Sequence, residues 1–180
     1  MQDEERIAQG LQKRDPDAWA EFYEEYFPKI YRYIAVRLGD KTEAEDLTEQ
    51  VFLKALESIS SFKWRGAPVS AWLFRIAHNQ VIDYRRTSKS KKSLPLDESL
   101  VSNDIDPEAA AEVNINISRL VQAVGQLTRA QRDVIELRFA GGLSTAEVAK
   151  ILGKREGAVK ALQHSALAAL RKRLSLGEQP

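Results

Sequence analysis

The stretch STAEVAKILGKREGAVKALQHSALAALRKR, residues 144–173, decides the fold of the second half of this 180-residue chain. Ser144 and Glu147 have the spacing of a capping box, in which the hydroxyl accepts from the N–H three residues on and the carboxylate reaches back. Apolar residues then recur at helical spacing up to Gly153, a residue suited to the left-handed position that ends a helix. A second helix follows, with a longer apolar stripe: Ala158, Val159, Leu162, Ala166, Leu167 and Leu170. Two helices joined by a tight turn predict a helix-turn-helix.

A helix-turn-helix places the N-terminal part of its second helix in the major groove of DNA. Glutamine can read adenine there, and lysine or arginine can contact guanine or phosphate. The side chains expected on this outer face are Arg155, Glu156, Lys160, Gln163 and His164. The alternative is a helical hairpin with a solvated face. The capping box, the glycine and the small-residue spacing together favour DNA binding.

Composition excludes several classes of protein. The chain is 43% hydrophobic, which is enough to build a core. It has no cysteine, so it has no disulfide framework, Cys-ligated zinc site or thiol nucleophile. The first six residues are acidic and lack the apolar core of a signal peptide, and no apolar run approaches the length of a membrane span. We therefore expect a cytoplasmic protein.

The net charge of +1 arises from blocks of opposite sign that cancel. Residues 1–84 carry a net charge of −4, residues 85–92 of +5, residues 97–112 of −6 and residues 113–180 of +6. The helix-turn-helix therefore lies in a basic part of the chain, as DNA binding requires, although the total is close to neutral.

The first half is predicted to start with two helical segments. A short amphipathic helix is expected over residues 3–13, and Asp15 followed by proline then suits the cap and first position of a new helix. Aromatic and aliphatic residues recur through residues 19–38, a pattern typical of a core. Pro28 is expected to kink or divide this helix.

A further helix is expected over residues 43–58, capped by Thr42. One face is apolar and is expected to be buried: Ala44, Leu47, Val51, Leu56 and Ile59. Asp46, Gln50 and Leu53 share another face at helical spacing. Such a mixed stripe is either an ordinary helix flank or a docking face for a partner helix.

Residues 62–68 interrupt the helical pattern with a predicted loop. It contains two aromatic and two cationic side chains: Phe62, Lys63, Trp64 and Arg65. This combination suits a surface that stacks unpaired bases and holds their phosphates. Alternatively, the two aromatic side chains cover the edge of the domain.

The next helix is expected over residues 70–87. Arg75, Asn79 and Asp83 are spaced to form one exposed line. His78, Arg85 and Arg86 are expected nearby. The line could hold a nucleic-acid strand or could be a solvated face.

Residues 88–107 are predicted to be a linker, because they contain few large apolar residues, two prolines and many Ser, Asp and Lys. Two helices are expected after it, over residues 108–125 and 128–140, packed against the helix-turn-helix. The second domain is therefore expected over residues 108–176.

Three motifs together resemble the bacterial sigma factors of the extracytoplasmic function (ECF) group, sigma-70 family. These motifs are AEDLTEQVFLKA at residues 44–55, WLFRIAHN at residues 72–79 followed by Asp83 and Arg85-Arg86, and residues 143–160. The resemblance covers nearly the full length and keeps the order of the parts. It implies an all-α protein with a region 2-like domain at 1–87, a flexible acidic linker at 88–107 and a region 4-like domain at 108–176.

The resemblance also implies function and site residues. The protein would be a transcription initiation factor, with no enzymatic activity and no cofactor, whose partners are core RNA polymerase, promoter DNA and an anti-sigma factor. Core polymerase would be bound by Asp46, Leu47, Gln50 and Leu53. The minus-ten element would be read and opened by Phe62, Lys63, Trp64, Arg65, Arg75, His78, Asn79, Asp83 and Arg86. The minus-thirty-five element would be read by Arg155, Glu156, Lys160, Gln163 and His164.

Two departures from the family and three rival interpretations accompany this prediction. Leu162 and Ser165 stand where many relatives carry arginine, and Glu49 and Gln50 are in the reverse of the common order.

An enzyme is disfavoured because the two histidines are far apart in sequence and no catalytic set converges. A sigma mimic that sequesters an anti-sigma factor without binding DNA would not need the cationic loop or a basic recognition helix. A dimeric repressor would leave the first domain unexplained.

Overall fold

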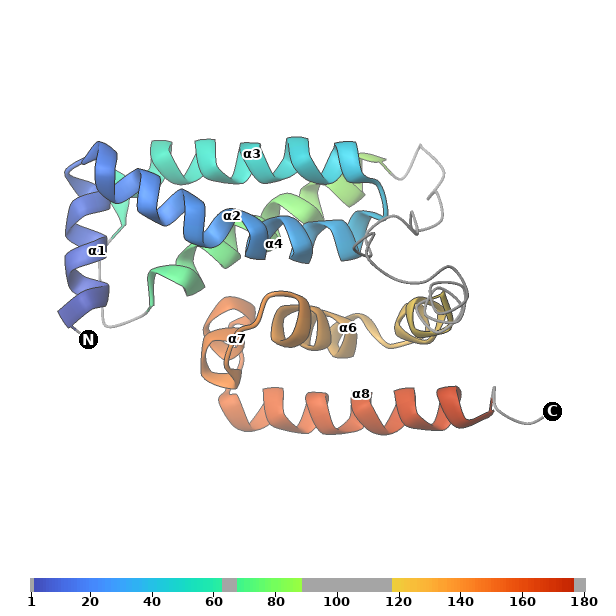
Figure 1. Ribbon diagram of the computed structural model, residues 1–180. Helices are drawn as coiled ribbons and strands as arrows, with labels where there is room; N and C mark the ends of the chain where they lie inside the picture. The colour runs from blue at the N-terminus through green and yellow to red at the C-terminus, as the bar shows by residue number, and fades with distance from the viewer. Residues whose placement is uncertain (1, 63–67, 89–117, 177–180) are drawn as a thin grey trace, which may run out of the picture.

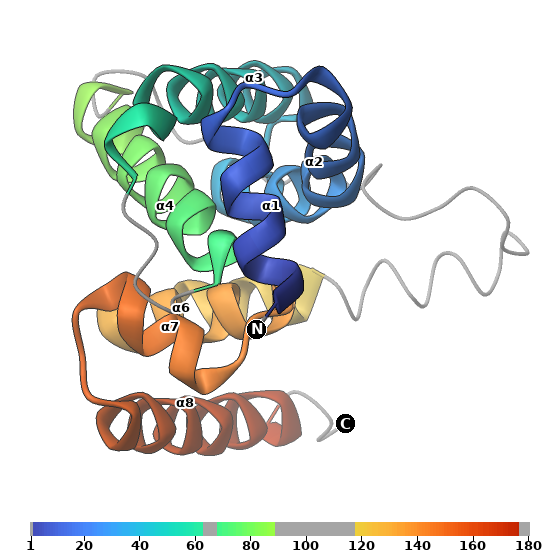
Figure 2. The same cartoon turned by 90° about the vertical axis from the view of Figure 1, so that its left-hand side faces the viewer.

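The computed structural model describes residues 2–62, 68–88 and 118–176. Within these ranges all regular secondary structure is helical, which confirms the predicted all-α class (Figure 1). The helices form two groups that lie one above the other, with α8 on the outer side of the second group (Figures 1 and 2). No described helix is long and apolar enough to cross a membrane.

The first group is formed by helices from the first half of the chain. Its elements are α1 (Gln2–Gln12), α2 (Pro16–Leu38), α3 (Lys41–Ser58), the short 3-10 helix η1 (Ile59–Ser61) and α4 (Val69–Ser88). Asp15 caps α2 as predicted, since its carboxylate accepts from the backbone N–H groups of Asp17 and Ala18. Gly39, in the left-handed conformation, ends α2 with a φ of 75°.

Of the two outcomes predicted for Pro28, division of the helix does not occur, since α2 runs through this residue. The carbonyl four residues earlier loses its donor, and both residues are exposed to solvent. The predicted cap of the next helix was wrong. Helix α3 is capped by Asp40 rather than Thr42, since the carboxylate of Asp40 accepts from Glu43 N at 2.9 Å. Asp ranks above Thr as an N-cap, and the helix consequently starts two residues earlier than predicted.

The second group contains the helix-turn-helix. Its elements are a helix over residues 118–125, α6 (Arg129–Ile135), the π-helical η3 (Glu136–Ala140), α7 (Thr145–Leu152) and α8 (Glu156–Leu176). Thr128 caps α6 in a capping box with Gln131, so the helix predicted from residue 128 begins one residue later. Residues 108–117 of the other predicted helix lie outside the described residues.

One hydrophobic core joins the two groups. Val134 and Leu137 of the second group are fully buried in the same cluster as Tyr33 of α2 and Phe74 of α4. A smaller core inside the second group contains Ala123, Leu127, Ile135, Ala166 and Leu170. The two groups therefore form a closed arrangement, in which η3 packs against α2 and α7 packs against α4.

Gly141 permits the close approach at this joint. A Cβ atom at this position would lie 2.9 Å from the ring of Phe74 and 2.7 Å from the carbonyl oxygen of Leu137. The neighbouring Gly142 has a φ of 71°, which a side chain would strain. The two glycines that follow η3 thus have different roles, one in packing and one in the turn.

Candidate nucleic-acid and polymerase interfaces

The helix-turn-helix has the local geometry that its sequence predicts. Ser144 Oγ accepts from Glu147 N at 3.2 Å, and Glu147 Oε2 accepts from Ser144 N at 2.8 Å. Gly153 ends α7 in the left-handed conformation with a φ of 62°. Partial burial raises the pKa of Glu147, but hydrogen bonds from Ser144 and Ser70 outweigh burial and lower it below its usual value. An ionised Glu147 at the N-terminus of α7 is favourable for the helix dipole.

The outer face of α8 presents four of the five predicted DNA-reading residues. Arg155, Glu156, Lys160 and His164 are exposed. Glu156 pairs with Lys160 at 2.9 Å and accepts from Thr145 Oγ1 at 2.8 Å, and these contacts lower the pKa of Glu156. The positive charge of this face therefore rests on Arg155 and on Lys160, which is partly neutralised.

The fifth predicted residue, Gln163, is already engaged within the protein. Its Oε1 accepts from Arg138 Nε at 2.9 Å and its side chain is half-buried. Leu162 packs against the shared core, and Ser165 accepts from Gln131 Nε2 at 3.1 Å. The two departures from the family pattern thus have internal packing partners. Ala158, predicted in the buried stripe, is exposed instead.

A line of polar side chains on α4 forms the second candidate DNA surface. Arg75, Asn79, Asp83 and Arg86 are all exposed, as the spacing predicts. Arg86 Nη2 lies 3.3 Å from Asp83 Oδ1, an exposed pair that contributes little to stability. Phe62, the first residue of the predicted loop, packs against Trp72 with ring centroids 5.0 Å apart. Lys63, Trp64 and Arg65 lie outside the described residues.

His78, which was predicted to lie near the exposed line and contact the minus-ten element, is buried instead. It is only 7% exposed, and its Nδ1 lies 3.0 Å from Tyr33 Oη and 3.2 Å from Arg37 Nη1. Burial, together with the nearby charge of Arg37, lowers the pKa of His78 to about 4. A neutral ring lets Nδ1 accept a hydrogen bond from one of these neighbours. In this arrangement His78 is covered by protein and contacts no outside partner.

The predicted polymerase face of α3 is mostly exposed. Asp46 and Gln50 face solvent, and Leu53 is 60% exposed, which is unusual for leucine. Leu47, by contrast, is only 4% exposed and belongs to the core, so a surface role for it was wrong. Leu56, predicted to be buried, is 39% exposed, and Tyr23 of α2 is similarly exposed beside Phe52. The face is therefore more apolar than its sequence pattern suggested.

Sequence reasoning missed a buried ionic cluster between the two groups. The guanidinium of Arg37 in α2 donates to the carboxylates of Asp133 and Glu136 in the second group. It also donates to Tyr33 Oη at 2.7 Å. Burial raises the pKa of Glu136, and Arg37 opposes that shift. The sequence does contain a signal for this cluster: Asp133 and Glu136 lie three residues apart within one apolar run, and Arg37 lies within another apolar run.

The closed arrangement also brings α4, which carries one candidate DNA surface, against α7 of the second group. Arg75 of α4 donates to the backbone oxygen of Lys150 in α7, and Ser70 Oγ donates to Glu147 Oε1 at 2.7 Å. Arg32 of α2 donates to Ala140 O at 2.8 Å. The side chain of Arg75 is therefore held by the second group rather than free for another partner.

Comparison with known families matches both groups. Residues 22–91 match the model of Sigma-70 region 2, and residues 123–172 match that of Sigma-70, region 4. The ECF RNA polymerase sigma factor SigW of Bacillus subtilis is 34% identical over 185 residues, covering 97% of each chain. The chain belongs to the ECF RNA polymerase sigma factors. The ECF RNA polymerase sigma factor BldN of Streptomyces coelicolor is 37% identical over 166 residues. These residues cover 91% of this chain and 63% of BldN.

Solved structures agree with this sigma factor's fold. The structure of CnrH in complex with the cytosolic domain of CnrY has a TM-score of 0.72 at 21% identity, covering 96% of this chain and 97% of that one. The sigma factor RpoE in complex with the anti-sigma factor NepR from Bartonella quintana has a TM-score of 0.59 at 26% identity, covering 86% and 97%. The high coverage in both shows that the fold extends over both groups of helices.

Proposed function

We propose that this sigma factor directs transcription initiation by binding core RNA polymerase and recognising the minus-ten and minus-thirty-five promoter elements. The observation that carries the proposal is the presence, in one chain, of region 2 and region 4 matches, each with an exposed polar line on a helix. Initiation by such a factor needs no cofactor or catalytic group in this chain. Its place of action would be the cytoplasm, where polymerase and promoter DNA are found.

The α3 face is proposed to bind the polymerase. Leu53 and Leu56 provide exposed apolar surface, and burying such surface against a partner stabilises the complex by roughly 25 cal/mol per Å². Asp46 and Gln50 at the rim would fix the orientation of a docked helix. A mixed surface of this kind suits a helical partner better than a nucleic acid, because it carries no cation on its central line.

The α4 line and the loop before it are proposed to open the minus-ten element. Removing a base from the stack costs a few kcal/mol. Stacking on an aromatic side chain returns about 1–3 kcal/mol per base. One or two captured bases would therefore offset the opening, with Trp64 as the proposed platform and Arg75, Asn79 and Arg86 as contacts to the displaced strand.

The outer face of α8 is proposed to read the minus-thirty-five element. Arg155 and Lys160 are the exposed cations near the start of the helix, where base edges are contacted. Glu156 already holds Lys160, so reading with Lys160 requires this exposed pair to separate. Because Leu162 and Ser165 supply no charge, phosphate contacts are fewer and the affinity of the isolated chain for DNA is expected to be weak.

Binding to both elements requires the closed arrangement to open. In the closed arrangement α4 is bonded to α7, because Arg75 donates to the backbone oxygen of Lys150 and Ser70 donates to Glu147. Promoter elements about two helical turns apart are separated by roughly 70 Å of duplex. The two groups of helices must therefore separate when polymerase and promoter are bound, and Arg75 is released in that step.

An anti-sigma factor is the proposed inhibitory partner. RpoE, the structural neighbour at 26% identity, was solved bound to the anti-sigma factor NepR. A protein that stabilises the closed arrangement would keep the α4 and α8 surfaces from reaching their elements together. The alternative function, a sigma mimic that only sequesters an anti-sigma factor, shares this partner but predicts no transcript.

Reconstitution with core polymerase tests the proposal. Purified chain and core would be incubated with a library of bacterial promoter DNA, and the run-off transcripts sequenced. Initiation at sites that share two spaced elements, lost in Asn79→Ala and Lys160→Ala but kept in the charge-matched surface control Lys29→Ala, is the expected result. Core binding without any transcript would instead support the mimic, and the absence of core binding would refute the proposed function.

A further inference from the structure

Two arginines of α2 reach across the joint and bond to the second group. Arg37 donates to the carboxylates of Asp133 and Glu136. Arg32, five residues earlier, donates from Nε to the backbone oxygen of Ala140 at 2.8 Å. Both bonds lie where α2 packs against the second group. A guanidinium that bonds to another group in this way lies at the surface of its own group.

A third arginine stands beside these two. Arg85, near the end of α4, donates to the backbone oxygen of Arg37 and is half-buried. Burial and the charge of Arg37 lower the pKa of Arg85, and the nearby carboxylate of Glu136 opposes that shift. Arg85 directly precedes Arg86, the last residue of the exposed line on α4. The arginine cluster, defined as Arg32, Arg37 and Arg85, therefore continues the proposed DNA surface of α4 towards α2.

The carboxylates that pair with Arg37 belong to the other group of helices. Asp133 and Glu136 are three residues apart, a spacing that places two side chains on one helix face. Arginine binds carboxylates and phosphates with the same planar fork of N–H donors. The two carboxylates thus offer Arg37 the charge and the acceptors that a phosphate would offer. When the groups separate, both carboxylates leave with the second group and the arginine cluster stays with the first.

The phosphates of DNA suit the arginine cluster once it is freed. Arg32 and Arg37 are about 7.5 Å apart along α2, close to two of the roughly 3.4 Å steps between charges along one DNA strand. A strand that contacts Asn79 and Arg86 on α4 would find Arg85 at the adjoining residue. This continuity with the α4 line favours DNA over an acidic protein segment as the anion.

We propose that the arginine cluster is a phosphate-binding site for promoter DNA beside the minus-ten element, and that Asp133 and Glu136 occupy this site in the closed arrangement. The inference rests on the proposed function, because it assigns further contacts to the same promoter complex. Phosphate and carboxylate compete for one guanidinium, so closure and DNA binding exclude each other at Arg37. The free chain consequently binds DNA less tightly than its open arrangement would.

The salt dependence of promoter binding tests the site. Each phosphate contact that is lost lowers the slope of log K against log salt concentration by about 0.9. The complex with core polymerase would be titrated with a labelled promoter fragment at several KCl concentrations, and core binding would be measured separately. Arg37→Met and Arg32→Gln should each lower the slope by about 0.9 and weaken promoter binding by about tenfold.

Two comparisons separate this role from a structural one. Arg32 is exposed, so its replacement changes no buried group. Lys29→Met removes a cation from the same helix, whose partner is Glu25, and should leave the slope unchanged. A merely structural role of Arg37 would weaken promoter binding without changing the slope.

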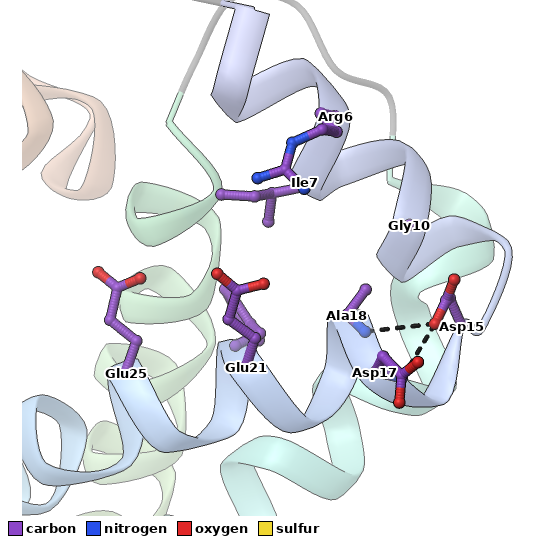
Figure 3. Close-up of a pocket in the computed structure, with 9 residues that line it drawn as sticks. Arg6, Ile7, Gly10, Asp15, Asp17, Ala18, Glu21 and Glu25 are labelled. Carbon is purple, nitrogen blue, oxygen red and sulfur yellow. Dashed lines mark hydrogen bonds between the residues drawn. The ribbon is translucent and has the colours of Figure 1, made fainter.

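The free chain tests the competition. Asp133→Asn with Glu136→Gln removes both carboxylates and keeps the arginine cluster, so this variant should bind a duplex of the minus-ten region about tenfold more tightly than the wild type. The control is Glu21→Gln with Glu25→Gln, which removes the same charge at the pocket between α1 and α2 (Figure 3). Glu25 lies about 18 Å before Arg37 along α2. With core polymerase bound and the groups already apart, the carboxylate variant should bind the promoter within about twofold of the wild type.

Three results would overturn the inference. They are wild-type slopes in both arginine variants, free-chain binding by the carboxylate variant that is no tighter than that of its control, and a loss of core binding that accounts for the whole promoter defect. The last result would assign the arginine cluster to the polymerase. Failure of the proposed function is distinguishable, because the wild-type complex would then give no promoter-specific binding and no transcript, while the free chain would still report the competition.

Discussion

Replacing Arg37 with alanine is expected to open the closed arrangement. The change removes the cation from two carboxylates of the second group, Asp133 and Glu136, and from Tyr33. Glu136 is 4% exposed, so it would be left as a buried charge without the guanidinium that pairs with it. Separation of the two groups would return the carboxylate of Glu136 to water without unfolding either group.

The magnitude follows from the burial of the cluster. Removing one partner of a buried ion pair costs about 3–5 kcal/mol, because the remaining charge is desolvated without compensation. If the closed arrangement bears this full penalty, the ratio of closed to open molecules falls by a factor of about 10² to nearly 10⁴. Exposed pairs contribute only about 0–1 kcal/mol. Arg86→Ala, which removes the exposed partner of Asp83, is therefore the matched control.

The absence of cysteine makes the assay direct. Dyes attached through Glu45→Cys on α3 and Ser175→Cys on α8, both exposed positions, report the distance between the two groups by energy transfer. Arg37→Ala should lower the transfer efficiency, Arg86→Ala should not, and Arg37→Met with Glu136→Met should restore it, because apolar replacement of a buried pair is often neutral. Unchanged transfer in Arg37→Ala, with both groups folded, would refute the reasoning.

Three more results are expected. The pKa of His78 is about 4, against an ordinary value of about 6.5, so the unfolded chain takes up the proton at a higher pH than the folded chain. The free energy of unfolding should therefore fall as the pH drops from about 6.5 towards 4. In urea titrations, His78→Gln should remove up to about 3 kcal/mol of that fall. Ser144→Ala should destabilise the helix-turn-helix by about 1 kcal/mol in thermal melts, and an unchanged midpoint would show that the capping box contributes nothing. Leu53→Ala should weaken core binding and leave the free energy of unfolding within about 0.5 kcal/mol of wild type. Leu47→Ala, at a buried position, should instead lower the free energy of unfolding by about 2–5 kcal/mol.

Local structure was the most predictable part of this protein. The capping box at Ser144, the left-handed Gly153 and the exposed line through Arg75 and Asn79 all follow from interactions within a few residues, which a sequence displays directly. The cap of α3 was misplaced because Asp40 and Thr42 are both acceptable N-caps, and only the hydrogen bond to Glu43 distinguishes them.

Contacts between distant segments were not predictable in the same way. Leu47 and Leu56 both suit a buried face, and the packing of α2 and α4 decides which of them is covered. The burial of His78 depends on Arg37 and on carboxylates about 96 to 99 positions beyond that arginine in the chain. No periodicity within one helix contains that information. The roles of the site residues on α4 and α8 therefore remain predictions, whereas the exposure of those other than His78 and Gln163 is observed.

The most direct test of the account measures the distance between the two groups in the working complex. The dyes at Glu45→Cys and Ser175→Cys would be followed first in the free chain, then with core polymerase, and then with promoter DNA. High transfer in the free chain and a large fall in the transcribing complex is the predicted result, because the two DNA surfaces must reach elements about 70 Å apart. A complex that initiates transcription with transfer as high as in the free chain would contradict the account.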